Sequence, residues 1–376
     1  MGNMKIVMLG PTHPYRGGIA HYMTLLCQTL RQYHEVTFIS FKRQYPNILF
    51  PGKTDKDPSK KTLRIDNVSY ILDSMNPLSW IAVYRCIGEL RPDKVLISWW
   101  IAFWTPQFWT IVTLLKRRFD VEIVVICHNA IEHETNSLKK LATKIFLKKA
   151  DRIITHSKED TLKLKDLMGN QIHAITAFHP TYSDIGSNLC TKEKAKERFE
   201  LSGAVLLFFG FIRDYKGLDV LLEAMSFIIQ CTRVTLLIVG EFWKDKQKYF
   251  NLIERFGLSA YVKVVDEYVP NESIGFYFSA SDLVVQPYRS ASGSGVAQLA
   301  YGFDRPVIAT NVGSLSEVVK DGINGRIVEP GDAKALAHAI IESLECATLR
   351  KFSRNAVDTK KEYSWDRLAK IVAGRS

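Results

Sequence analysis

Two cations in the second half of the sequence are spaced to bind phosphate. Arg213 and Lys216 follow the apolar run 204–210 and come just before Gly217, where a predicted helix begins. Guanidinium and ammonium groups neutralise phosphate oxygens, and the N-terminus of a helix offers backbone N–H groups that favour an anion. The spacing therefore predicts a diphosphate site. The alternative is that both cations are solvated loop charges. Their position at the carboxyl end of a strand, where ligands bind in α/β folds, disfavours this alternative.

A second phosphate cradle is predicted further along the chain. Ser292, Ser294 and Gly295 follow the apolar run 282–287 and precede another predicted helix. Small residues of this kind let backbone N–H groups and hydroxyls converge on an anion. Glu317 lies beyond the next apolar run and adds a carboxylate, so we expect it among the ligand-binding residues.

In the first half, the apolar run 6–10 leads into a glycine turn. Gly17 and Gly18 have no side chains, and a helix near 18–32 follows them. Backbone N–H groups at the start of that helix can therefore approach a phosphate or a sugar closely. The spacing is not G-x-G-x-x-G, so no dinucleotide site is indicated. A tight strand–helix turn without a ligand is the alternative.

A histidine follows another strand candidate. His128 comes directly after the apolar run 122–126, where a side chain is well placed to contact a substrate hydroxyl. A structural histidine with satisfied hydrogen bonds is the alternative. His133 and Glu134 could ligate a metal, but no H-x-x-x-H spacing and no third ligand accompany them, so no metal site is predicted.

The elements that must position these residues are short apolar runs that alternate with helix-length amphipathic segments. The strand candidates are 6–10, 36–40, 94–98, 122–126, 151–156, 173–177, 204–210, 234–240, 262–266, 282–287, 306–310 and 325–330. This α/β alternation indicates parallel sheets covered on both faces. We expect two doubly wound domains, 1–180 and 181–360, followed by a C-terminal helix in 361–376. Ligands bind at the carboxyl ends of the strands in such folds.

Composition limits the class of protein. The 376 residues are 47% hydrophobic and 24% charged, which is typical of a globular chain and excludes disordered and collagen-like proteins. Six cysteines lie scattered without a C-x-x-C pair, which predicts free thiols in a reducing compartment. The first ten residues do not resemble a signal peptide. We therefore expect a cytoplasmic protein.

One stretch could be taken for a membrane span. Residues 95–115 carry no charge, but Pro106 would interrupt a single helix near its middle. We therefore predict a strand over 94–100 and a helix over 104–117 instead of a transmembrane helix.

The positive charge is concentrated in the first half. Residues 1–180 hold 25 Lys and Arg against 15 Asp and Glu, whereas the remainder holds 25 against 24. A predicted helix over 137–150 places lysines 140, 144 and 148 beside several apolar residues. This pattern suits an anionic membrane surface, which would make the protein peripheral on the inner face of the membrane. An ordinary surface helix is the alternative, and no nucleic-acid-binding motif is present.

The ordered motifs resemble those of the family-4 glycosyltransferases of GT-B fold. They are R-x-x-K-G-x-D-x-L-x-x-A, I-V-G, P-Y-R-S-A-S-G-S-G, R-P-V-I-A-T-N-V-G, E-V-V-K-D-G-x-N-G and a late Y-S-W, with P-x-R-G-G-I-A and C-H-N in the first half. The resemblance spans essentially the whole chain and is most specific over 205–335.

This resemblance implies two facing Rossmann-like domains with a cleft between them, of which the first binds the acceptor and the second the sugar nucleotide. It further implies that the C-terminal helix in 361–376 packs back on the first domain. It also implies a retaining transferase that needs no metal or other cofactor. A UDP- or GDP-sugar would be the donor, and a saccharide or lipid-linked molecule of the cell envelope would be the acceptor. The implied contacts are the donor diphosphate for Arg213 and Lys216, phosphate or acceptor for Gly17 and Gly18, the transferred sugar for His128, and the base for Tyr268 and Val269.

The sequence departs from the family pattern in two places. Many members carry Glu-x7-Glu, but alignment on Pro306 places Ala291 and Leu299 at these positions. Neither side chain accepts a hydrogen bond. The family's arginine also lies about five residues before the lysine, where this chain has Phe211, while Arg213 lies three residues before it.

The missing Glu pair leaves alternatives open. Ser292 and Ser294 are the expected substitutes for the two carboxylates in an active transferase. The alternatives are a non-catalytic scaffold subunit that binds a sugar nucleotide, and a sugar-nucleotide epimerase of GT-B fold.

Overall fold

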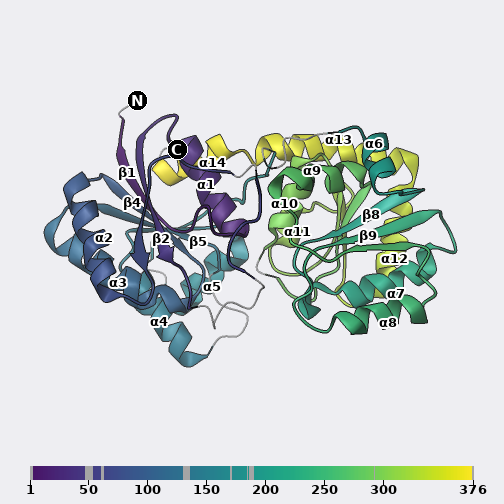
Figure 1. The fold of residues 1–376 in the computed structure, drawn as a ribbon, viewed down its shortest axis with the longest axis horizontal. Helices are drawn as coiled ribbons and strands as arrows, with labels where there is room; N and C mark the ends of the chain where they lie inside the picture. Colours follow the sequence, from purple (N-terminus) through teal and green to yellow (C-terminus); the bar gives the residue numbers. More distant parts are fainter. Residues whose placement is uncertain are drawn as a thin grey trace. The chain divides into compact units, whose positions relative to one another are not determined.

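A computed structural model describes residues 3–46, 54–60, 63–129, 136–169, 172–183, 185, 190–291 and 293–374. The chain folds into two compact units (Figure 1). The first unit consists of Met1–Pro58, Thr62–Phe178 and Trp365–Ser376, and the second consists of Ser59–Lys61 and His179–Ser364. Each unit is an α/β structure with its own parallel sheet.

The first unit is built on a seven-stranded sheet with the order β3-β2-β1-β4-β5-β6-β7. Its strands are β1 (Lys5–Leu9), β2 (Glu35–Arg43), β3 (Val68–Asp73), β4 (Lys94–Trp99), β5 (Glu122–Cys127), β6 (Arg152–Thr155) and β7 (Ala174–Thr176). Its helices are α1 (Gly18–Leu30), α2 (Pro77–Leu90), α3 (Thr105–Arg118), α4 (Ser137–Leu147), α5 (Lys158–Met168) and α14 (Trp365–Ala373). All neighbouring strands are parallel, as the alternating pattern predicts.

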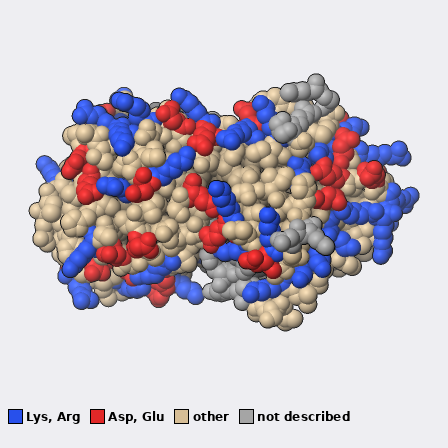
Figure 2. Space-filling model, turned by 180° about the vertical axis from the view of Figure 1, so that it is seen from behind, with Lys and Arg blue, Asp and Glu red and all other residues tan. Residues whose placement is uncertain are grey.

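Lysine and arginine side chains are prominent on the surface of the first unit. In the space-filling view they gather along the right-hand edge, which belongs to this unit (Figure 2). This placement agrees with the excess of basic residues in the first half of the sequence.

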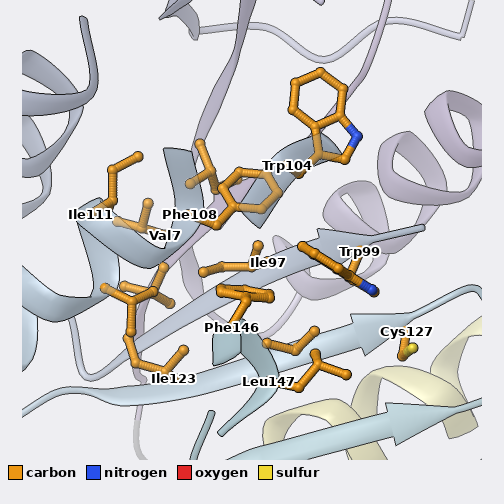
Figure 3. Packing of buried hydrophobic residues seen from close by; sticks show 14 of the residues in the cluster. Val7, Ile97, Trp99, Trp104, Phe108, Ile111, Ile123, Cys127, Phe146 and Leu147 are labelled. Atoms are coloured by element: carbon orange, nitrogen blue, oxygen red, sulfur yellow. The ribbon is translucent and has the colours of Figure 1, made fainter. Parts of the chain in front are cut away.

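The uncharged stretch 95–115 forms a strand and a helix, as predicted. Its residues enter β4, a short 3-10 turn (Ala102–Trp104) and α3. Trp99 of β4 stacks on Phe146 of α4 with ring centroids 4.6 Å apart, and Trp104 and Phe108 extend the same buried cluster (Figure 3). The apolar side chains of residues 95–115 therefore pack in the core of this unit. Among the described residues, no helix is long and apolar enough to span a membrane.

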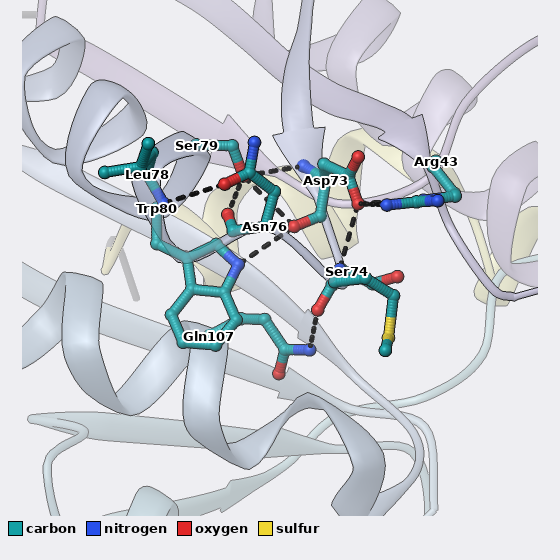
Figure 4. A network of polar contacts seen from close by, with 9 residues as sticks. Arg43, Asp73, Ser74, Asn76, Leu78, Ser79, Trp80 and Gln107 are labelled. Atoms are coloured by element: carbon teal, nitrogen blue, oxygen red, sulfur yellow. Dashed lines mark hydrogen bonds and ion pairs between the residues drawn. The ribbon is translucent and has the colours of Figure 1, made fainter.

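β3 and α2 were not among the predicted elements. β3 is a short edge strand that is only partly buried, so its sequence lacks the continuous apolar run that identifies the central strands. A polar network holds its end (Figure 4). Arg43 donates to Asp73 at 2.9 Å, Asn76 caps α2 by accepting from the Leu78 N–H, and Trp80 Nε1 donates to the Asp73 carbonyl.

The second unit is built on a six-stranded parallel sheet with the order β10-β9-β8-β11-β12-β13. Its strands are β8 (Ala204–Phe209), β9 (Val234–Val239), β10 (Val262–Val265), β11 (Leu283–Gln286), β12 (Val307–Thr310) and β13 (Gly325–Val328). Its helices are α6 (Lys192–Arg198), α7 (Leu218–Ile228), α8 (Lys246–Arg255), α9 (Asn271–Ala280), α10 (Gly295–Gly302), α11 (Leu315–Val318), α12 (Ala333–Leu344) and α13 (Cys346–Glu362). All six strands match apolar runs predicted from the sequence.

The C-terminal helix α14 belongs to the first unit although it follows the second in the chain. The Arg152 guanidinium donates to the carbonyl oxygens of Ile371 and Val372 at 2.9 and 2.7 Å. These carbonyls lie in the last turn of α14, where the regular helical donors four residues ahead run out, although the Gly374 N–H also donates to the Ile371 carbonyl at 3.0 Å. Arg152 therefore fixes the end of this helix.

Candidate active site

The chain leaves β8 through a loop that only glycine can close. Gly210 has φ 95°, residues Asp214–Lys216 form one 3-10 turn (η3), and Gly217 has φ 65° where α7 begins. A Cβ on Gly217 would lie 2.0 Å from the carbonyl oxygen of Pro287. A side chain at this position is therefore excluded both by a clash with the Pro287 backbone and by the left-handed φ.

This loop buries the ammonium group of Lys216. The residue is only 8% exposed, and its Nζ lies 5.5 Å from the ring centroid of Tyr288. In the part of the chain that the structure describes, Nζ has no carboxylate within ion-pair distance. Desolvation, together with the nearby Arg213 guanidinium, lowers the pKa of Lys216 to about 7. A buried cation without a counter-ion is costly, so this site favours an anionic ligand.

The Lys216 ammonium lies beside the N-terminus of α10. A Cβ placed on Gly210 would be 3.1 Å from Lys216 Nζ and 3.6 Å from Val296 Cγ2, so the two groups share one position at the end of β8. Ser294 caps α10 by accepting from the Val296 N–H at 3.2 Å, and it also hydrogen-bonds Tyr288. The positive end of the α10 dipole and the Lys216 ammonium therefore both favour an anion at the end of β8.

Arg213 is held by aromatic side chains. Its guanidinium carbon lies 3.6 Å from the ring centroid of Trp243, and it hydrogen-bonds Tyr215. The Trp243 ring is 4.8 Å from Phe211, which is 6.0 Å from Tyr268. The structure thus joins two predicted site residues, Arg213 and Tyr268, through one aromatic cluster that follows the ends of β8, β9 and β10.

An ion pair that the sequence analysis missed ties this loop to the next strand. Arg289, just after β11, binds Asp219 of α7 through two contacts of 2.8 and 2.7 Å. Its backbone N–H also donates to the Tyr215 carbonyl at 2.6 Å. Burial would raise the pKa of Asp219, but the Arg289 guanidinium outweighs it and holds that pKa below its usual value. This bidentate pair positions the segment that carries Arg213 and Lys216.

In the first unit, the predicted glycine turn opens α1. Gly17 has φ 111°, and a Cβ added at Gly17 or Gly18 would meet no heavy atom within 4 Å. Open space therefore borders the α-carbons of both glycines at this helix start. His21 lies one turn further and contacts Asp57 at 3.3 Å.

His128 is embedded among aromatic rings. Its backbone N–H donates to the Trp99 carbonyl at 2.8 Å. The Tyr22 ring meets the imidazole edge-on at 4.7 Å, and the ring of His156 lies 5.4 Å away. Trp365 of α14 packs on Tyr22 at 5.2 Å, so the C-terminal helix supports this arrangement.

The other predicted residues are distributed as follows. Val269 is buried, and Glu317 is half-buried on the short helix α11. Ser292, His133 and Glu134 lie outside the described residues. Within the described ranges, no group of three side chains could hold a metal ion.

The structure brings together two sets of predicted residues. Arg213, Lys216, Ser294, Gly295 and Tyr268 lie at adjoining strand ends of the second unit. Gly17, Gly18 and His128 belong to the first unit. The sequence analysis assigned no role to four residues that contact these sets: Trp243, Tyr288, Asp219 and Arg289. Asp219 belongs to the motif R-x-x-K-G-x-D, and Tyr288 and Arg289 belong to P-Y-R-S-A-S-G-S-G, so these three could have been singled out, whereas Trp243 lies in none of the quoted motifs.

A solved structure has the same architecture over its full length. Anabaena HepE in complex with UDP matches with a TM-score of 0.74 at 18% identity, covering 99% of each chain. Two α/β units with parallel sheets, together with this match, define a GT-B fold.

Sequence comparison identifies the family. Residues 16–177 match Glycosyltransferase Family 4, and residues 203–346 match Glycosyl transferases group 1. The chain belongs to the family-4 glycosyltransferases.

Two relatives illustrate the extent of the similarity. An uncharacterized glycosyltransferase of Methanocaldococcus jannaschii is 26% identical over 370 residues, covering 97% of this chain and 95% of the relative. D-inositol 3-phosphate glycosyltransferase 2 of Catenulispora acidiphila is 28% identical over 238 residues, which cover 60% of this chain and 55% of the relative. The chain thus spans about half the length of this second relative.

Proposed function

We propose that the protein transfers a sugar from a nucleotide-sugar to a saccharide or lipid-linked acceptor in cell-envelope polysaccharide synthesis. The observation that carries the proposal is the buried Lys216 ammonium, which lies beside a helix N-terminus and has no carboxylate partner among the described residues. A diphosphate supplies the missing negative charge. Anabaena HepE, which shares the fold, has been solved with UDP and with UDP-glucose.

In this proposal the protein neutralises the leaving diphosphate without a metal ion. The bond between the anomeric carbon and the diphosphate oxygen breaks, and negative charge develops on that oxygen. Lys216, Arg213 and the N–H groups that open α10 stabilise this charge. The acceptor hydroxyl then attacks from the face that the diphosphate leaves and passes its proton to the departing diphosphate oxygen, so the anomeric configuration is retained. The anomeric coupling constant of the product, measured by NMR, tests this stereochemistry, and an inverted product would contradict it.

The aromatic cluster of Phe211, Trp243 and Tyr268 is proposed to border the nucleotide base. Flat rings offer stacking surface, and the buried Trp243 Nε1 is a donor without a partner among the described residues. His128 is proposed to contact the transferred sugar, and the turn at Gly17 and Gly18 the phosphate or the acceptor.

A non-catalytic scaffold that binds a sugar nucleotide is the second candidate. Ala291 is buried at the first position of the family's Glu pair, and Leu299 occupies the second. The Ser294 hydroxyl is used by the helix cap and by Tyr288. Release of nucleoside diphosphate in the presence of an acceptor distinguishes the transferase from this scaffold.

Donor binding is expected to take up a proton above neutral pH. Because the pKa of Lys216 in the ligand-free protein is about 7, most molecules carry a neutral amine at Lys216 at pH 8. A bound diphosphate requires the ammonium form, so binding at pH 8 is accompanied by net proton uptake of up to about one proton per nucleoside diphosphate. Affinity should also fall about tenfold for each pH unit above 7.

Isothermal titration calorimetry measures this uptake. The apparent binding enthalpy is compared in Hepes and in Tris at pH 8, with EDTA present throughout. The Lys216→Met variant serves as the control and should give no heat of donor binding in either buffer. Proton release, or binding by the wild type without any proton exchange, would contradict the assignment of the diphosphate to Lys216.

A further inference from the structure

Helix α4 has apolar side chains on two sides. Phe146 and Leu147 are buried in the core of the first unit. On the other side, Leu138, Leu141 and Ile145 are 76, 53 and 43% exposed. Their spacing of three and four residues aligns them in one stripe along the helix. A stripe of large apolar side chains left in water marks an interaction surface.

A row of lysines runs beside this stripe. Lys140, Lys144 and Lys148 follow one another at intervals of four residues, so they lie along one side of the helix. Across the described ranges, none of the three ammonium groups pairs with a carboxylate. The row therefore presents three cations next to the apolar side chains, and no carboxylate of the described residues neutralises them.

Helix α3 adds an aromatic ring to the same region. Trp109 is 38% exposed, and the Nζ of Lys149, just beyond α4, lies 5.9 Å from its ring centroid. Tryptophan is favoured at the boundary between hydrocarbon and water, because one ring carries both an apolar body and a polar N–H group.

We propose that the α4 surface, defined as Leu138, Lys140, Leu141, Lys144, Ile145 and Lys148, docks the protein on an anionic phospholipid bilayer. An apolar stripe alone would suit a protein partner equally well. The lysine row decides for the bilayer, because lysines that flank an interfacial helix bind anionic headgroups while the apolar side chains enter the acyl boundary. The basic first half of the chain, with 25 Lys and Arg against 15 Asp and Glu, adds long-range attraction.

This proposal goes beyond sugar transfer and does not depend on it. Membrane binding through α4 can be measured without donor or acceptor, so its failure and failure of the proposed function are distinguishable. If both hold, docking would bring the transferase to acceptors that are anchored in lipid.

Vesicle sedimentation tests the apolar stripe. The full chain is expected to bind vesicles of phosphatidylglycerol and phosphatidylcholine in equal parts. The double variant Leu141→Ser/Ile145→Ser should lower the partition coefficient at least about tenfold. The matched control, Leu78→Ser/Leu162→Ser, removes leucines of the same unit that are 78 and 61% exposed, and should bind like the wild type. Equal losses in both double variants would overturn the proposal.

The lysine row has its own test. Lys140→Gln/Lys144→Gln/Lys148→Gln should also weaken binding at least about tenfold, and the wild type should bind phosphatidylcholine vesicles poorly. Circular dichroism and melting temperature confirm that each variant is folded. Wild-type binding by the triple variant would overturn the proposal. So would self-association of the wild type that Leu141→Ser/Ile145→Ser abolishes, because a second copy would then occupy the surface.

Discussion

Replacing Lys216 with methionine is expected to remove most transferase activity while raising the stability of the fold. Methionine preserves the length of the buried side chain but not its charge. Loss of one preorganised group that stabilises a developing negative charge lowers kcat/KM by about 10²–10³. Release of nucleoside diphosphate, measured at saturating acceptor, gives this value.

The gain in stability has a defined pH dependence. Lys216 has a pKa of about 7 in the fold, against an ordinary value of 10.5. Between these values the unfolded chain binds a proton that the folded chain lacks, so burial of Lys216 costs most below pH 7 and progressively less toward pH 10. Lys216→Met should therefore exceed the wild type in melting temperature more at pH 6 than at pH 9.

An exposed lysine of the same unit provides the control. Lys334 lies on α12 and is exposed. Lys334→Met should leave activity unchanged and shift the melting temperature little. Activity of Lys216→Met within tenfold of the wild type, or a variant less stable at pH 6, would show that Lys216 does not play the assigned role.

Gly217→Ala is expected to cost far more stability than Gly257→Ala. Both glycines have φ 65°, which an alanine adopts at a cost of about 1–2 kcal/mol. A Cβ at Gly257 meets nothing within 4 Å, whereas at Gly217 it would lie 2.0 Å from the Pro287 carbonyl oxygen. Either the loop that carries Gly217 or the segment after β11 that carries Pro287 must then move. We expect Gly217→Ala to lower the free energy of unfolding by more than about 4 kcal/mol.

Urea unfolding of the two variants measures this difference. Gly217→Ala should also lose donor binding, because the displaced loop carries Lys216, whereas Gly257→Ala should bind the donor normally. Similar losses of stability in the two variants would mean that the close approach of Gly217 to Pro287 does not constrain the fold.

Most strands, including the edge strands β7, β10 and β13, could be predicted from sequence because each lies in an apolar run. All six strands of the second unit and six of the seven in the first are of this kind, for example Val234–Val239. β3 was missed because Ser69 and Tyr70 interrupt its short apolar run, and its neighbours in the sequence are polar. Its end is held by Arg43 and Gln107, which lie 30 and 33 residues away from their partners in the chain.

The candidate site was partly predictable for a similar reason. Arg213 and Lys216 are local to one strand–helix junction, so their position followed from spacing. Their environment did not, because it depends on contacts distant in sequence. Arg289 reaches Asp219 across 70 residues, and the burial of Lys216 under Tyr288 is a property of the folded sheet.

The most direct test of the proposed donor site is thermal unfolding with a panel of nucleoside diphosphates and their sugars in EDTA. The account predicts that one nucleoside diphosphate and its sugar raise the melting temperature of the wild type. A hundredfold excess over the dissociation constant corresponds to about 2.7 kcal/mol. The same ligands should leave Lys216→Met unshifted. A wild-type chain that no ligand stabilises, with EDTA or with magnesium, would contradict the account.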